Sequence, residues 1–126
     1  MYSEITLKEF EWYLRDYFFR VNNRNENDFK SIFDTNEICS FMKENYLKYK
    51  TWNTEEITKL FNIVITDLHH RNVLVIKEDS SAVMLISKFV RKQCANCHYI
   101  NYLASSESPN CHRCKSDNLK DFPPKK

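Results

Sequence analysis

Residues 53–86, NTEEITKLFNIVITDLHHRNVLVIKEDSSAVMLI, combine a helical pattern with two strand-like runs. Asn53 followed by Glu56 predicts the start of a helix, because an Asn side chain can accept a hydrogen bond from a backbone N–H three residues later. Apolar residues then recur at helical spacing: Ile57, Leu60, Phe61, Val64 and Leu68. Asn72 fits the C-terminal cap. The apolar runs 73–76 and 82–86 surround a polar turn, so they predict a β-hairpin.

Two more helices and a short strand are predicted upstream of this stretch. Thr6 and Glu9 have the spacing of a capping box, which predicts a helix from Thr6 to about residue 23. Its apolar stripe consists of Leu7, Phe10, Leu14, Tyr17, Phe18 and Val21. Residues 31–33 read as a short strand, and Asp34 caps a second helix with Ile38 and Met42 facing inward.

The predicted order is helix, strand, helix, helix and hairpin, which is that of a winged helix-turn-helix domain over residues 1–88. In helix-turn-helix proteins a helix in the position of the third one enters the major groove of DNA. Winged helices also serve widely as protein-docking units, so the fold leaves both functions open.

Two C-x-x-C pairs follow the hairpin: Cys94 with Cys97, and Cys111 with Cys114. Each pair can present two thiolates to one ion, and four thiolates complete the tetrahedron of a structural Zn²⁺. The spacing therefore predicts one structural zinc in a ribbon over residues 89–118, followed by a flexible tail over residues 119–126. A redox dithiol and an iron–sulfur cluster are the alternatives that spacing alone leaves open.

Composition limits the remaining choices. The 126 residues suit one core with a small appendage. They contain no apolar run as long as a membrane helix, so neither a membrane nor export is expected. Paired cysteines of the metal-binding type favour a reducing compartment, so we expect an intracellular protein, nuclear if the source is eukaryotic and cytoplasmic otherwise.

No group of residues has the spacing of a catalytic motif, so the sequence predicts neither an enzyme nor a small-molecule substrate. Cys39 reads as a buried thiol that packs like a small apolar residue. His69 and His70 read as the polar end of the third helix.

Charge is unevenly distributed. Residues 1–87 carry 11 Lys and Arg against 14 Asp and Glu, whereas residues 88–126 carry 8 against 3. Seven basic residues are candidate nucleic-acid contacts: Lys59, Arg71, Lys88, Arg91, Lys92, Arg113 and Lys115. Glu55, Glu56 and Asp67 on the third helix count against a DNA-reading role for that helix.

A winged helix followed by a ribbon with Cys94, Cys97, Cys111 and Cys114 resembles the α subunit of general transcription factor E and its archaeal homologue. The resemblance implies a winged helix that docks on RNA polymerase and assists promoter opening. We therefore expect a non-catalytic accessory subunit of transcription or replication machinery that contacts double- or single-stranded DNA and other protein subunits. The alternative is a protein–protein adaptor without nucleic-acid binding, as in winged-helix subunits of endosomal-sorting complexes.

Overall fold

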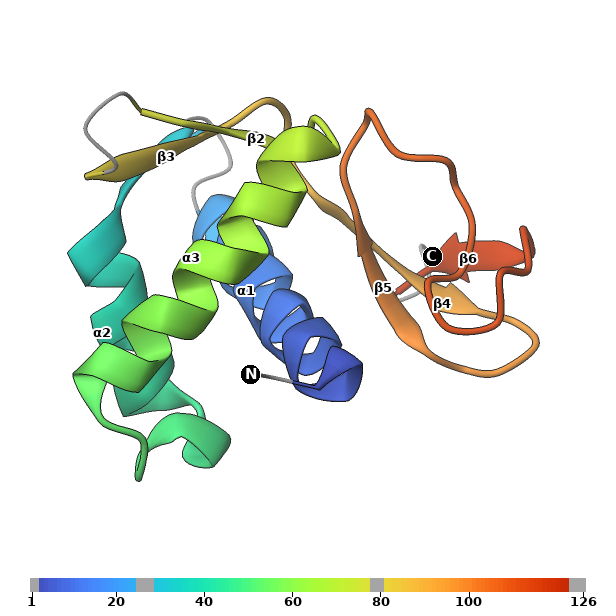
Figure 1. Ribbon diagram of the computed structural model, residues 1–126. Helices are drawn as coiled ribbons and strands as arrows, with labels where there is room; N and C mark the ends of the chain where they lie inside the picture. Colours follow the sequence, from blue (N-terminus) through green and yellow to red (C-terminus); the bar gives the residue numbers. More distant parts are fainter. Residues whose placement is uncertain (1–2, 25–28, 78–80, 123–126) are drawn as a thin grey trace.

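The chain has a mixed α+β structure, as the sequence predicts (Figure 1). It is a computed structural model that describes residues 3–24, 29–77 and 81–122. These residues form three α-helices, one short 3-10 helix and two antiparallel three-stranded sheets. The first sheet caps the helices, and the second lies beside α1 on the side away from α2 (Figure 1).

Helix α1 (Glu4–Arg24) begins two residues earlier than predicted. The Ser3 hydroxyl, rather than Thr6, accepts a hydrogen bond in the first turn, from the Thr6 backbone N–H at 3.2 Å. The predicted stripe faces the core, where Phe10, Leu14 and Phe18 are fully buried. Within the described ranges, none of the helices combines the length and apolar character that a bilayer crossing requires.

Helix α2 (Thr35–Asn45) and helix α3 (Thr54–His70) have the predicted caps, with the 3-10 helix η1 (Leu47–Tyr49) between them. The Asp34 carboxylate accepts from two backbone N–H groups at the start of α2, and the Asn53 side chain accepts from one at the start of α3. Both predicted helix starts are therefore confirmed.

Helix α3 ends in a Schellman-type turn at Asn72, which has φ 61°. The Asn72 N–H donates to the His69 carbonyl at 3.1 Å, and the Val73 N–H donates to the Leu68 carbonyl at 3.0 Å. Asn tolerates the left-handed region better than most residues. Gly is the usual residue at this position, but the chain contains no Gly, and Asn72 occupies the position instead.

The first sheet consists of β1 (Ile32–Asp34), β2 (Leu74–Ile76) and β3 (Ala82–Leu85) in the order β1-β3-β2. The predicted short strand and hairpin are thus confirmed, although residues 78–80 of the predicted turn lie outside the described residues. The buried side chains of the sheet join the helices in one core: Phe33, Leu74, Val83 and Leu85.

The second sheet consists of β4 (Val90–Cys94), β5 (Ile100–Leu103) and β6 (Leu119–Asp121) in the order β5-β4-β6. Residues 119–121 were expected to belong to a flexible tail, but they form β6, which pairs with β4 and extends the ribbon. Residues 123–126 lie outside the described residues. Phe89, predicted as the first ribbon residue, belongs to the helical core, where its ring stacks on Phe18 at 6.0 Å.

Candidate metal centre

The four cysteines of the two C-x-x-C pairs meet at one point, with all four sulfur atoms within 4.8 Å of one another. The Cys94 and Cys114 sulfurs are 3.5 Å apart, and the Cys97 and Cys111 sulfurs are 3.6 Å apart. These separations are too long for disulfide bonds. They are close to the roughly 3.8 Å between ligand sulfurs in a tetrahedron with metal–sulfur bonds of about 2.3 Å. The residues present therefore fit a four-thiolate metal site.

The first pair lies at the end of β4 and in the turn after it, and the second lies in the loop between β5 and β6, but the two have similar local backbones. His98 follows the first pair with φ 65°, and Lys115 follows the second with φ 67°. The His98 N–H donates to the Cys94 carbonyl at 2.9 Å, and the Lys115 N–H donates to the Cys111 carbonyl at 3.0 Å. Each turn thus needs a left-handed residue directly after its second cysteine, a position that Gly would occupy without strain.

Backbone N–H groups stabilise thiolates within the cluster. The Cys97 N–H donates to the Cys94 sulfur and lowers the pKa of Cys94. Burial favours the neutral thiol of Cys111, but the N–H groups of Cys114 and Arg113 outweigh it and lower the pKa of Cys111 to about 6.

The neighbouring sulfurs act on the Cys114 thiol. The Ser116 N–H favours its thiolate, but the Cys94 sulfur, burial and the sulfurs of Cys97 and Cys111 together outweigh this effect and raise the pKa of Cys114 to about 12. Sulfurs this close repel one another when all are ionised. A metal cation at their centre would remove that repulsion, so the donor set is suited to metal binding.

Asn101 on β5 connects the sheet to the second cysteine pair. It is completely buried, and its carbonyl oxygen accepts from the His112 N–H at 2.8 Å. Its amide nitrogen donates to the Tyr99 carbonyl at 3.2 Å, and its side chain also interacts with the Cys111 sulfur and favours the thiolate. Asn101 therefore fixes the position of Cys111 relative to the strand that follows the first pair.

A buried ion pair attaches the ribbon to α1. The Arg15 guanidinium donates to both Glu107 carboxylate oxygens at 2.6 and 2.7 Å and to the Tyr102 carbonyl at 2.7 Å. Arg15 is only 1% exposed, so these contacts are shielded from water. Nearby, the Trp12 indole N–H donates to the Ile100 carbonyl at 2.8 Å. The metal centre is thereby held in a fixed position relative to the helices.

A second polar cluster surrounds Asp16, which is also 1% exposed. Its carboxylate accepts from the Tyr102 hydroxyl of the ribbon, from the Tyr46 hydroxyl at 2.7 Å and from Arg20 at 2.8 Å. Burial, with Asp16 adding to it, raises the pKa of Tyr102 to about 12, so the phenol stays a hydrogen-bond donor. Asp16 thus joins α1, the segment after α2 and the ribbon.

These buried contacts had not been predicted. Arg15 and Asp16 lie next to Leu14 and between apolar stripe positions, where charged residues usually mark the solvated face of a helix. The available signal was the wide apolar surface of this helix: Trp12, Tyr13 and Phe19 extend it beyond the predicted stripe and pack against the core. Such a helix contacts partners on more than one side.

The seven predicted nucleic-acid contacts fall into two groups. Four are engaged within the described structure: Lys59 with Glu55, Arg71 with Glu11 and Asp67, Lys92 with Asp121, and Arg91 between the Phe19 and Phe122 rings. The other three are exposed and make no ion pair with a described residue: Lys88, Arg113 and Lys115. Of the seven candidates, those without an ion pair to a described residue thus lie on the ribbon or on the segment that leads into it.

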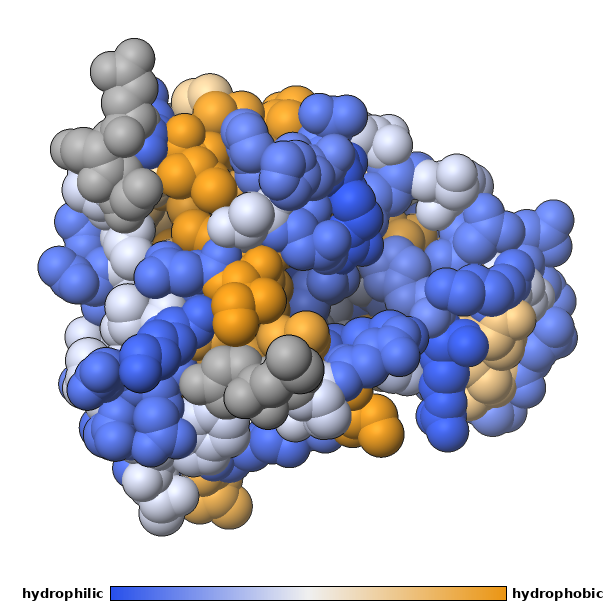
Figure 2. All heavy atoms as spheres, viewed as in Figure 1, coloured by the Kyte–Doolittle hydropathy of each residue, from blue (hydrophilic) through white to orange (hydrophobic). Residues whose placement is uncertain are grey.

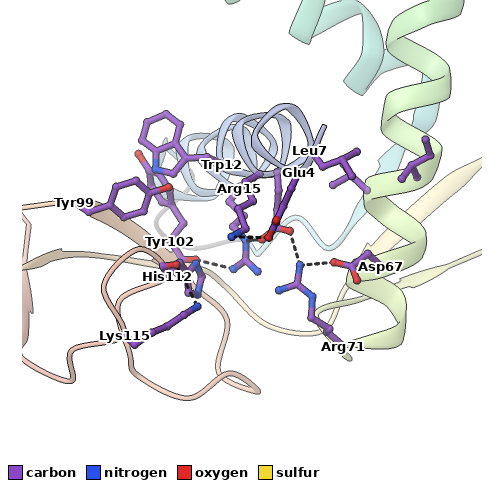
Figure 3. Close-up of a pocket in the computed structure, with 14 residues that line it drawn as sticks. Glu4, Leu7, Trp12, Arg15, Asp67, Arg71, Tyr99, Tyr102, His112 and Lys115 are labelled. Carbon is purple, nitrogen blue, oxygen red and sulfur yellow. Dashed lines mark hydrogen bonds and ion pairs between the residues drawn. The ribbon is translucent and has the colours of Figure 1, made fainter. Parts of the chain in front are cut away.

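A cleft of 510 Å³ is lined by residues of α1, α3 and the ribbon (Figure 3). The helices contribute an apolar floor with Leu7, Ile63 and Val64, and the ribbon contributes Tyr99, His112 and Lys115. Arg71, just after α3, lies across the open side of the cleft from His112 and Lys115 (Figure 3).

Comparisons with protein-family models, curated proteins and solved structures gave no match for this chain. Function is therefore argued from the geometry of the metal centre, its attachment and the charged surface around it.

Proposed function

We propose that the chain is a zinc-binding, non-catalytic accessory subunit of transcription or replication machinery, in which a winged helix and a zinc ribbon act as one unit. The observation that carries this proposal is the four-cysteine ribbon held against α1 by the Arg15–Glu107 ion pair. A ribbon fixed in this way presents its surface at a constant position relative to α3.

Zinc is the ion that best suits the site. Four thiolates in a tetrahedral arrangement favour Zn²⁺ over harder cations, and an iron–sulfur cluster is the alternative with the same ligands. Four protein ligands leave no position for water, so the ion would stabilise the ribbon rather than activate a nucleophile.

The winged-helix assignment is supported by the order of the elements. Three helices, a short strand between the first two and a hairpin after the third form one core, and β1 pairs with β3 at the edge of the sheet. In this assignment α3 has the position that the recognition helix takes in DNA-reading relatives of the fold, and the β2–β3 hairpin is the wing.

Nucleic-acid contact is assigned to the ribbon rather than to α3. On α3 the Lys59 charge is paired with Glu55, whereas Lys88 and Arg113 near the ribbon are exposed without a described carboxylate partner. A phosphate backbone would meet less repulsion on the ribbon side.

A gel-shift assay across a range of salt concentrations tests this assignment with double-stranded and single-stranded DNA. The variant Lys88→Ala/Arg113→Ala should weaken the shift and reduce the slope of log affinity against log salt by about 0.7 to 0.9 for each phosphate that the variant no longer neutralises. The control Lys48→Ala/Lys50→Ala removes two charges on and beside η1 and should leave the slope unchanged. Absence of any shift at low salt refutes nucleic-acid binding.

A protein–protein adaptor is the second candidate. It is favoured by Ile63, which lies on α3 and is 47% exposed, and by apolar side chains visible at the surface over the middle of α3 (Figure 2). An apolar residue at this position suits a protein partner better than a DNA groove.

A further inference from the structure

The cleft between the helices and the ribbon has the properties of a peptide-docking site. Its volume of 510 Å³ lies within the usual range for ligand pockets, about 300 to 1,000 Å³. Its floor is apolar, and Ile63 in that floor is 47% exposed. Exposed aliphatic residues beside a cleft favour a protein contact.

One of the four cations that line the cleft forms no ion pair with a described carboxylate. Lys8 pairs with Glu4, Arg15 pairs with Glu11 and Glu107, and Arg71 pairs with Glu11 and Asp67. Among the described residues, Lys115 is the remaining lining cation and has no carboxylate partner there.

The Lys115 ammonium instead donates to the His112 carbonyl at 3.3 Å, on the ribbon wall. Arg71 faces this wall from across the cleft (Figure 3). An occupant with an acidic group at this end would complement the unpaired charge.

We propose that this cleft binds a segment of a partner protein that carries an apolar side chain and, nearby, an acidic residue. The apolar side chain would occupy the floor formed by Leu7, Ile63 and Val64, and the carboxylate would meet Lys115. The inference deepens the protein-docking part of the proposed function and rests on it.

The lining favours a peptide over a nucleic-acid strand. Three carboxylates, Glu4, Glu11 and Asp67, line the same cleft. A run of phosphates would bring several negative charges close to them, whereas a single carboxylate can sit at the Lys115 end alone. The exposed part of Ile63 offers an apolar surface that a phosphate backbone cannot use.

The test is selection of a displayed library of short random peptides on the immobilised, zinc-loaded full chain, followed by fluorescence anisotropy of the enriched peptides. Enriched peptides should combine a large apolar residue with a neighbouring Asp or Glu. Ile63→Lys and Lys115→Glu should each weaken their binding by about tenfold or more. A peptide in which Lys replaces the acidic residue should regain affinity for the Lys115→Glu variant.

Matched controls keep the result specific to the cleft. Leu47→Lys changes an apolar residue that is 82% exposed on η1, and Lys120→Glu reverses an exposed charge on β6, both away from the cleft lining. Both should leave affinity unchanged. Zinc content and circular dichroism verify that every variant is folded, and Ile63→Gln and Lys115→Met replace any variant that is not.

The proposal is overturned if no enriched peptide depends on Ile63 and Lys115. It is also overturned if labelled oligothymidylate, rather than peptide, binds with that dependence. The gel shift with the Lys88→Ala/Arg113→Ala variant reports separately on nucleic-acid contact, and the zinc content reports on the ribbon. Failure of the cleft proposal is therefore distinguishable from failure of the proposed function.

Discussion

Replacing Arg15 by Leu should lower the free energy of unfolding by about 3–5 kcal/mol, because it removes the cation from a buried ion pair. The side chains of Arg15 and Glu107 are 2% and 12% exposed. Without Arg15, the described groups left near the Glu107 carboxylate are the Ala104 N–H and His112 Nε2, the latter at 3.9 Å. Burial lowers the pKa of His112, which favours the neutral imidazole, so His112 does not replace the lost cation. The Tyr102 carbonyl also loses its side-chain donor.

The large expected cost follows from leaving a charge buried without its partner rather than from the strength of the pair itself. The double variant Arg15→Leu/Glu107→Leu removes both charges and should therefore recover part of the loss. Burial favours neutral Glu107, but Arg15 outweighs it and lowers the Glu107 pKa, which is consistent with strong coupling between the two groups.

Urea denaturation of the zinc-loaded protein, at constant free zinc, measures these differences. The matched control is Lys59→Ala, which breaks an ion pair whose side chains are 66% and 78% exposed and should cost less than about 1 kcal/mol. If Arg15→Leu costs no more than Lys59→Ala, the ribbon is not held to α1 by this pair. A double variant less stable than both single variants would likewise contradict the argument.

Two further substitutions test the cysteine turns. His98→Gly and Lys115→Gly should each stabilise the zinc-loaded protein by up to about 1 kcal/mol, because Gly adopts the observed φ of 65° and 67° without strain. The control His70→Gly changes the last residue of α3 and should destabilise the protein by a similar amount. Urea denaturation measures all three free energies of unfolding. If neither His98→Gly nor Lys115→Gly stabilises the protein, the left-handed geometry of the two turns is contradicted. Asn101→Leu should weaken zinc binding by about 10- to 100-fold in competition with a chelating dye, because it removes the contacts that position Cys111; unchanged affinity would show that the backbone alone holds the site.

The three helices and the first sheet, α1 to β3, could be predicted from the sequence because local signals agreed with the tertiary structure. Asp34 and Asn53 each combine a capping side chain with a following apolar period, and both start helices. Thr6 and Glu9 have the same spacing, but the Ser3 hydroxyl lies one turn earlier and caps the helix first. A capping pattern in the sequence therefore predicts that a helix starts nearby. Its first residue depends on which of the neighbouring side chains forms the cap.

The metal ligands could be predicted from spacing, whereas the attachment of the ribbon could not. Tyr102 and Glu107 contact Asp16 and Arg15 across more than 80 positions of sequence, and no local pattern specifies such a pairing. Strand β6 was missed because residues 119–121 are short and include two charged positions, and its partner β4 supplies the stabilising hydrogen bonds. Lys115 was not expected at positive φ, since Lys has no side-chain group that favours that region.

Metal content measured by native mass spectrometry tests the central claim most directly. The full chain, purified without added metal, should carry one zinc ion, and Cys111→Ser should lose it together with the cooperative unfolding of the ribbon. Cys39→Ser should retain the ion, because Cys39 is buried in the helical core away from the cluster. A wild-type chain that binds no metal, or that carries iron and sulfide instead, would contradict the assignment of a structural zinc ribbon.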